Sequence, residues 1–334
     1  MRNRRLIILL ALLPVLAGCV VVVSSPFSAF GSDPGLQETV VDGEGDAKIL
    51  LLDISGFISD EPTSRALGLI QERSMLDRVA EELDTAAEDE DIRAVVLRIN
   101  SPGGGVTASD EIYHRLRRYH EATGVPVIAS LGSVAASGAY YLACAAQHIM
   151  AHPTSVTGSV GVIIVGVNVA GLMDKLGVAN QTYTTGSHKD MLSPLRETRP
   201  EEAEIVQSVL NDLFARFKQV VRSRGDKLDE QAWPDIIDGR IFSAERARQI
   251  GLTDATGRLQ DALDQARRMA GVDEARVIMY HREGAAVRTV YSRLADAPEA
   301  AHAGLPDLPL TSAPRLSPGL AATPQFLYLW QPGL

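Results

Sequence analysis

Patterns typical of buried strands and of amphipathic helices alternate along the middle of the chain. Short continuous apolar runs indicate buried strands, and apolar residues repeating every three or four positions indicate helices. We expect strands at residues 49–54, 92–99, 126–131, 148–151 and, as an extended segment, 181–184, and helices at 74–87, 134–146, 169–176 and 201–224. This alternation favours an α/β fold with a parallel sheet whose faces are covered by helices.

The N-terminus has the pattern of an export signal. Three arginines among the first five residues precede an apolar run that reaches residue 23. Residues 16–19 (LAGC) resemble a lipobox, which predicts a lipoprotein signal peptide at 1–18 and lipidation of Cys19. An uncleaved signal anchor to residue 23 is the alternative, since the run has about the minimum length for a spanning helix. In either interpretation, an exported folded domain is attached to a membrane.

Composition divides the rest of the chain into three parts. Residues 19–47 are rich in Ser, Gly, Pro and acidic residues and are expected to form a tether. A folded domain is predicted at 48–271, followed by a C-terminal extension at 272–334 with an Ala- and Pro-rich tail. The apolar residues 326–330 could dock on this domain, on a neighbouring copy or on a membrane surface, and the sequence leaves these three open.

Charge and cysteine usage exclude several classes of function. The net charge of −10, with no long basic tract, argues against a nucleic-acid partner. No CxxC, HExxH or carboxylate-loop spacing is present, so neither a metal nor a cofactor is expected. Cys144 lies in an apolar run and is interpreted as a small buried residue, with no disulfide framework available.

Two glycine- and serine-containing segments directly follow predicted strands. Residues 100–105 (NSPGGG) leave bare backbone N–H groups at the carboxyl edge of the sheet, where they can hold a phosphate or an oxyanion. Residues 132–141 (GSVAASGAYY) place Ser137 among small residues that admit a substrate backbone. The structural alternative makes Ser133 a helix N-cap and Ser137 a packed small residue.

A third segment, residues 185–196 (TGSHKDMLSPLR), is polar and contains Lys189. Together with residues 238–252, the three segments occur in the order and spacing of the signal peptide peptidase A family (serine peptidase family S49, single-domain type). The resemblance covers residues 48–271. It implies a crotonase/Clp protease-like fold, a parallel sheet core flanked by helices, and a homo-oligomeric ring, octameric for a chain with one copy of the domain.

The resemblance also implies roles for single residues. Ser137 would attack the scissile carbonyl and Lys189, contributed by an adjacent protomer, would take its proton. Backbone N–H groups of Gly138 and Gly104, with Gly103 as a further candidate, would form the oxyanion hole. A lysine has an ordinary pKa of about 10.4, so such a base requires burial that lowers the pKa. The implied substrates are remnant signal peptides or other hydrophobic peptides, cleaved at the membrane on the periplasmic side of a bacterial envelope.

Three alternatives accompany this prediction. A histidine base is one, since His188 lies in the lysine segment, although no G-x-S-x-G motif surrounds Ser137. An acyl-CoA hydratase or isomerase on the same fold is another, but it would use carboxylates as acid and base and would not need an export signal. The last is a catalytically inactive scaffold lipoprotein, which the presence of both Ser137 and Lys189 disfavours.

Overall fold

The computed structural model describes residues 35–65, 70–283, 285–292 and 325–330. The predicted signal segment, Cys19 and residues 296–324 of the Ala- and Pro-rich tail lie outside these ranges. Within them, no helix is long and apolar enough to cross a membrane.

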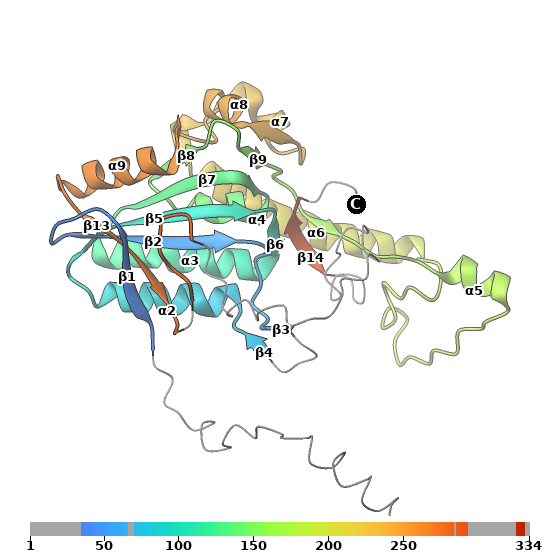
Figure 1. The fold of residues 1–334 in the computed structure, drawn as a ribbon. Coiled ribbons are helices and arrows are strands. Elements are labelled where there is room, and N and C mark those ends of the chain that lie inside the picture. Colours follow the sequence, from blue (N-terminus) through green and yellow to red (C-terminus); the bar gives the residue numbers. More distant parts are fainter. Residues whose placement is uncertain (1–34, 66–69, 284, 293–324, 331–334) are drawn as a thin grey trace, which may run out of the picture. The chain divides into compact units, whose positions relative to one another are not determined.

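A mixed, largely parallel sheet forms the centre of the described part of the chain (Figure 1). Nine strands belong to it among the described residues, and seven follow in the order β1 (Gln37–Asp42), β13 (Arg276–His281), β2 (Lys48–Ser55), β5 (Ile92–Ser101), β7 (Val127–Ala136), β8 (His148–Ala151) and β12 (Ala255–Thr256). Strand β9 (Val156–Gly158) pairs with β7, and β11 (Ile241–Ser243) pairs with β9. The pairs from β13 to β12 are parallel, which confirms the predicted parallel core.

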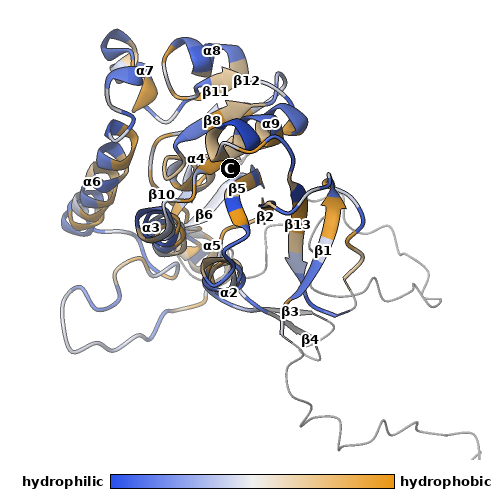
Figure 2. Ribbon diagram, turned by 90° about the vertical axis from the view of Figure 1, so that its left-hand side faces the viewer, coloured by the Kyte–Doolittle hydropathy of each residue, from blue (hydrophilic) through white to orange (hydrophobic). Residues whose placement is uncertain are grey.

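Helices cover both faces of this sheet. One face packs against α2 (Met75–Ala87), α3 (Val106–Thr123), α4 (Gly138–Ala143) and α6 (Pro200–Arg222), and the other against α9 (Leu259–Ala270). Alternate residues of β2 serve the two faces, Leu50 and Leu52 on the first and Ile49 and Leu51 on the second. Because side chains alternate along a strand, burial on both faces explains the continuous apolar runs. Figure 2 shows both hydrophobic and hydrophilic colours on the outer helices, as is expected of amphipathic helices.

Smaller elements complete the described structure. These are α5 (Ala170–Leu176), α7 (Trp233–Ile236), α8 (Ala244–Gln249), two 3-10 helices (Gly225–Lys227 and Glu230–Ala232) and the paired strands β3 (Thr63–Arg65) and β4 (Ile70–Glu72). A separate small sheet, three-stranded within the described ranges, has the order β10 (Ile163–Ile164), β14 (Phe326–Leu329), β6 (Gly103–Gly105).

Most predicted elements are confirmed, and two are corrected. The strands expected at 49–54, 92–99, 126–131 and 148–151 form β2, β5, β7 and β8, and the helices at 74–87, 169–176 and 201–224 form α2, α5 and α6. The helix expected at 134–146 is wrong at its start, because residues 134–136 continue β7 by pairing with β9. Residues 181–184 join no strand ladder of the described sheets.

The folded unit includes strands from both sides of the predicted range 48–271. Strand β1 lies in the segment expected to be a tether and pairs antiparallel with β13, which lies in the C-terminal extension. Strand β13 in turn pairs with β2, so strands from both sides of that range lie together at one edge of the sheet.

Candidate active site

Ser137 lies at the junction between β7 and α4, at the carboxyl end of a central strand. Its backbone has φ 55° and ψ −118°, a conformation that costs a non-glycine residue about 1–3 kcal/mol. Two backbone hydrogen bonds hold this conformation: the Ser137 N–H donates to Gly158 O (2.8 Å), and the Tyr141 N–H donates to Ser137 O (2.9 Å). Strain retained at a serine on a strand-to-helix turn indicates a functional residue.

The Ser137 hydroxyl is buried and unpartnered. The residue is 1% exposed, and its Oγ has no hydrogen-bond partner among the residues that the structure describes. Buried hydroxyls are normally hydrogen-bonded. An exception is expected at a site where the hydrogen-bond partner comes from outside the described residues. Lys189 is therefore not hydrogen-bonded to Ser137 within this chain.

Successive glycines of β6 direct their backbone N–H and C=O groups to opposite edges of the strand. The Ile58 N–H donates to Gly103 O (3.0 Å) and the Gly105 N–H donates to Ile58 O (2.9 Å). The Gly103 N–H donates to Ser101 Oγ (3.1 Å). Because successive residues of a strand face opposite edges, the backbone groups of Gly104 point to the other edge, where β14 lies.

Gly103 and Gly138 lie in direct proximity beside Ser137. A Cβ atom added at Gly103 would lie 2.9 Å from Gly138 N, and one added at Gly138 would lie 2.4 Å from Ser109 Oγ. Gly103 also has a φ of +104°, which side chains rarely adopt. The fold thus brings together the glycine segment and the serine segment that the sequence singled out.

The lysine segment lies elsewhere in the chain. It belongs to the loop between α5 and α6, and Figure 1 shows α5 and this loop projecting from the sheet and its helices. Lys189 is exposed, and its backbone N–H donates to Gly186 O (3.2 Å). Of the predicted catalytic pair, the structure therefore places only Ser137 next to the glycines.

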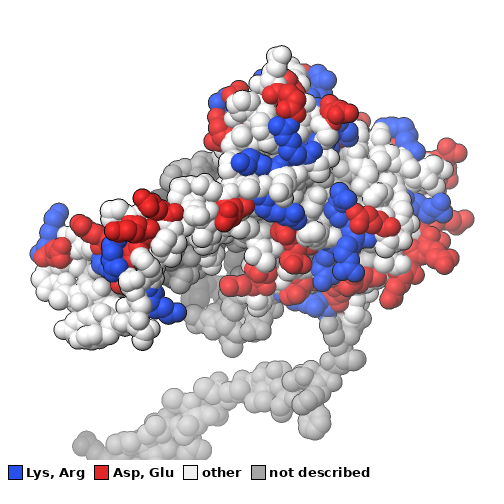
Figure 3. Space-filling model, turned by 180° about the vertical axis from the view of Figure 1, so that it is seen from behind, with Lys and Arg blue, Asp and Glu red and all other residues white. Residues whose placement is uncertain are grey.

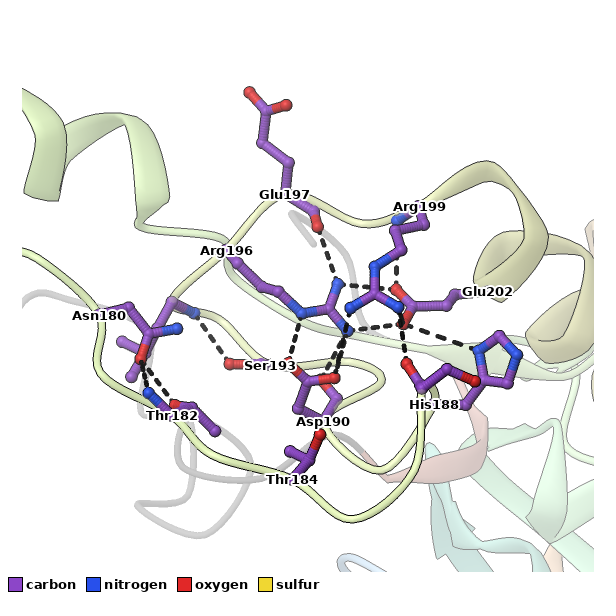
Figure 4. Close-up of polar contacts among 12 residues, drawn as sticks. Asn180, Thr182, Thr184, His188, Asp190, Ser193, Arg196, Glu197, Arg199 and Glu202 are labelled. Carbon is purple, nitrogen blue, oxygen red and sulfur yellow. Dashed lines mark hydrogen bonds and ion pairs between the residues drawn. The ribbon is translucent and has the colours of Figure 1, made fainter.

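An ion-pair network holds the lysine segment against the start of α6 (Figure 4). The Arg196 guanidinium donates through Nε to Asp190 Oδ2 (2.7 Å) and through Nη2 to Glu202 Oε1 (2.6 Å). Arg199 adds hydrogen bonds to Glu202 (3.2 Å, through its N–H) and to the Ser187 carbonyl (2.6 Å). The sequence analysis did not predict this network, although Arg196 belongs to the motif and Glu202 stands three residues after Arg199 at a helix start.

The network also sets the charge state of its acids. The hydrogen bonds from Arg196 lower the pKa of Glu202, whose side chain is fully buried, from its ordinary 4.5 to about 2. The same guanidinium lowers the pKa of Asp190. Both carboxylates therefore stay charged throughout the neutral range.

We expect the Arg196 network to control the opening of the loop. Since the pKa of Glu202 is depressed on folding, its stabilisation is complete above pH 4.5 and is lost as pH falls toward about 2. Hydrogen exchange of amides in residues 186–199, corrected for intrinsic rates, should stay constant from neutral pH down to 4.5 and then rise as the pH falls toward about 2. Arg196→Met should raise exchange there already at neutral pH.

A matched control for that measurement is Arg117→Met, which removes an exposed pair with Glu121 (2.7 Å) on α3. This variant should leave exchange in residues 186–199 unchanged. Unchanged exchange in Arg196→Met would contradict the assigned role of the network.

No other candidate side chain is hydrogen-bonded to Ser137 Oγ in the part of the chain that the structure describes. His188 Nδ1 lies 4.0 Å from Glu202 Oε1, so the described structure does not support a histidine base. In the part of the chain that the structure describes, no group of three His, Cys, Asp or Glu side chains could hold a metal ion. Cys144 is 6% exposed, and burial raises the pKa of its thiol to about 12, which confirms it as a small buried residue.

Comparison with known proteins agrees with this site. The family model for peptidase family S49 matches residues 120–273, and the model for Clp protease matches residues 65–157. The chain is 34% identical over 254 residues to the putative signal peptide peptidase SppA of Enterococcus faecium, covering 76% of this chain and 73% of that protein. It is 32% identical over 198 residues to the chloroplastic serine protease SPPA of Arabidopsis thaliana, covering 59% of this chain and 29% of that protein.

A strained, buried serine beside a strand of glycines, on a Clp protease-like sheet, defines a serine peptidase. The chain belongs to peptidase family S49.

Proposed function

We propose that this chain is a membrane-tethered serine endopeptidase that degrades remnant signal peptides or other hydrophobic peptides, with Ser137 as nucleophile and Lys189 as general base. The observation that carries the proposal is Ser137 itself: its backbone is strained, and its hydroxyl is buried and without a partner in the described chain. An inactive scaffold would gain nothing from this strain. A hydratase would use carboxylates as acid and base, and no carboxylate hydrogen-bonds to Ser137 Oγ among the residues that the structure describes.

The oxyanion hole is assigned to the backbone N–H groups of Gly104 and Gly138. The Gly104 N–H is on the edge of β6 that faces away from Ile58, and Gly138 is the first residue of α4. The Gly103 N–H already donates to Ser101 Oγ, so Gly103 contributes space at the site and not a hydrogen bond. Two fixed donors of this kind stabilise the negative charge of a tetrahedral intermediate.

Lys189 reaches Ser137 from a neighbouring copy in this proposal. The arm that carries it, residues 165–198, presents large apolar side chains to solvent with exposures from 40% to 92%: Val167, Leu172, Leu176, Val178, Tyr183 and Leu195. Figure 3 shows an uncharged surface on the lower part of this arm, with acidic and basic side chains along its upper edge and over the main body. Exposed apolar surface of this extent is typical of a protein interface.

Such an interface would also activate the lysine. Packing the arm on the next copy in a ring removes the ammonium group from water, and desolvation lowers the pKa of a lysine. The neutral amine can then accept the serine proton. A head-to-tail ring, octameric in our proposal, would repeat the same contact at every active site.

The tether and the location are proposed from the N-terminal segment. Residues 1–18 would be removed and Cys19 would carry the lipid. The segment from Cys19 to residue 47 would include the tether to the folded unit, which would lie outside the cytoplasm. The name of the Enterococcus faecium relative, signal peptide peptidase, supports hydrophobic leader remnants as substrates. Substrates released into a membrane would be reached by a tethered enzyme at high local concentration.

The test is labelling and hydrolysis by matched serine variants. A fluorophosphonate should label the wild-type chain on Ser137, and Ser137→Ala should lose both labelling and hydrolysis of an apolar fluorogenic peptide, by about a thousandfold or more. Ser133→Ala, which removes an exposed hydroxyl four residues earlier, should retain both. Hydrolysis that persists in purified Ser137→Ala would overturn the proposed function.

A further inference from the structure

A cavity of about 320 Å³ lies at the carboxyl ends of the central strands, on the face of the sheet that α9 covers. Figure 1 shows α9 on the opposite side of the sheet from α2 and α3. Tyr140 and Tyr141, which follow Ser137 in α4, pack on that other side. Neither Ser137 nor a glycine of β6 lines the cavity. It is therefore a second candidate site, at the end of the strands where open α/β sheets bind ligands.

The lining of the cavity is mostly polar, because the strands change character along this face. On the side of α9, β5 presents Val96 and then Arg98 and Asn100. In the same way, β7 presents Ile128 and then Ser130. Since alternate side chains of a strand share a face, the apolar positions pack against α9 and the polar positions that follow face the cavity. This end of the sheet suits a polar ligand better than a packed helix.

Arg98 fixes the mouth of the cavity and has its charge paired within the chain. Its Nε donates to Asp53 Oδ1 (3.0 Å), and its Nη1 and Nη2 donate to the carbonyls of Val290 and Ser292. These bonds hold that segment over the strands, so that Tyr291 lines the cavity. Asp53 is 2% exposed, and Arg98 balances its charge. This ion pair therefore builds the wall and leaves ligand binding to other groups.

The groups that remain free in the cavity are mainly hydrogen-bond donors. Ser130 is 7% exposed, and its Oγ makes no hydrogen bond with a described residue. Asn100 Oδ1 accepts from Val134 N (3.2 Å), and its amide Nδ2 has no partner in the described ranges. His152 Nδ1 accepts from Thr154 N (3.2 Å), so the proton of the neutral ring lies on Nε2. Because buried hydroxyls are normally hydrogen-bonded, Ser130 indicates a ligand that the chain itself does not supply.

Positive charge at the cavity comes from Arg258 and from the start of α9. Arg258 is the N-cap of this helix, and its exposed guanidinium forms no ion pair with a described residue. Leu259, the first residue of α9, also lines the cavity, and a helix N-terminus carries partial positive charge. The Asp261 carboxylate of the first turn accepts from the Arg258 N–H (2.7 Å) and is not part of the lining. An unpaired guanidinium together with free donors favours an anion.

We infer that this cavity binds the C-terminal carboxylate of a short peptide, with Arg258 as its ionic partner. The donors of Ser130 and Asn100 fix the orientation of the carboxylate. A carboxylate accepts several hydrogen bonds at once, and a planar guanidinium matches its two oxygens. The inference goes beyond the proposed function and does not depend on the roles of Ser137 and Lys189.

The rest of the cavity and the family of the protein favour a peptide end over a bare anion. Leu131, Leu259 and the ring of Tyr291 form an apolar wall on which the last side chain of a peptide can lie. The volume is near the lower limit of small-molecule sites, which suits one terminal residue and not a long segment. Each hydrolysis by a peptidase releases a new C-terminal carboxylate, so such ligands form at this enzyme's own active site.

Binding is tested by calorimetric titration of the full-length Ser137→Ala variant with N-acetylleucine, which carries a carboxylate and one apolar side chain. We expect a dissociation constant of about a millimolar. N-acetylleucinamide lacks the charge and should bind at least about tenfold more weakly. Acetate lacks the side chain and should also bind at least about tenfold more weakly.

Three substitutions in the Ser137→Ala background locate the ligand. Arg258→Met keeps most of the side-chain length but removes the charge, so it should weaken binding by about tenfold or more. Arg268→Met is the matched control: it removes an arginine from the last turn of the same helix, where it bonds to Gln265 (2.7 Å), and should leave binding unchanged. Ser130→Ala should weaken binding by about threefold without lowering the Tm, because its hydroxyl has no partner in the described chain. Thermal unfolding verifies that all three variants fold.

The outcomes separate this inference from the proposed function. Equal binding of N-acetylleucine and its amide, or unchanged binding in folded Arg258→Met, overturns the inference. Acetate or inorganic phosphate that binds as tightly as N-acetylleucine overturns it as well, since the site would then recognise a bare anion. All of these titrations are made without the Ser137 hydroxyl. Peptide hydrolysis that persists in Ser137→Ala would overturn the proposed function and leave this inference standing.

Discussion

Mixing the Ser137→Ala and Lys189→Ala variants in equal amounts, under conditions in which subunits exchange, should restore about a quarter of the wild-type peptidase activity. Each variant alone should be about a thousandfold less active or worse, since each lacks one member of the proposed dyad. Restoration follows if each site takes its serine from one copy and its lysine from the next. A quarter of randomly formed contacts then combine an intact serine with an intact lysine.

The control is a mixture of either variant with the double variant Ser137→Ala/Lys189→Ala, which should stay inactive. Native mass spectrometry shows whether mixed assemblies form. Mixed assemblies without recovered activity would place serine and lysine in the same chain. That result would require the α5 arm to fold back onto its own active site, in contrast to the unpartnered Ser137 hydroxyl of the described chain.

Gly103→Ala should lower kcat/KM by about a hundredfold or more while the protein remains folded. The added Cβ would lie 2.0 Å from Tyr328 O and 2.9 Å from Gly138 N, and the residue has a φ of +104°. The methyl group therefore blocks the strand that pairs with β6 and displaces an oxyanion donor. Initial rates with an apolar peptide and thermal unfolding measure the two effects.

The same strand offers a matched control for this substitution. A Cβ on Gly105 would meet nothing closer than 3.8 Å, so Gly105→Ala should retain activity within about threefold. A Gly103→Ala enzyme as active as Gly105→Ala would contradict the position that we assign to the oxyanion hole. Loss of folding in Gly103→Ala would instead appear in the unfolding curve.

Local patterns predicted most of the sheet and its outer helices. The continuous apolar runs at 49–54 and 92–99 predict strands because both faces of β2 and β5 are buried. The pattern was misleading at residues 134–136, where two alanines favour a helix and one valine favours a strand. Pairing with β9, about twenty residues away in sequence, decides in favour of a strand.

Contacts between distant segments were beyond the reach of local patterns. Residues 326–330 are apolar, but their docking depends on pairing Tyr328 with Gly104, more than two hundred residues earlier. The Arg196 network joins residues only six positions apart, but it depends on how the loop turns back to the first turn of α6. Neither contact leaves a periodic pattern in the sequence. Each depends on where the tertiary structure places the two elements that it joins.

The sequence by itself determined the family, which is shown by similarity, and the order and spacing of its motifs named the candidate groups: a serine, a lysine and a glycine strand. Only the tertiary structure decided how these groups are used. It engages the Gly103 N–H with Ser101 and turns Gly104 toward β14, because neighbouring residues of a strand face opposite edges. It buries Ser137 without a partner while Lys189 stays exposed on an arm, since a single chain does not bring the two segments together.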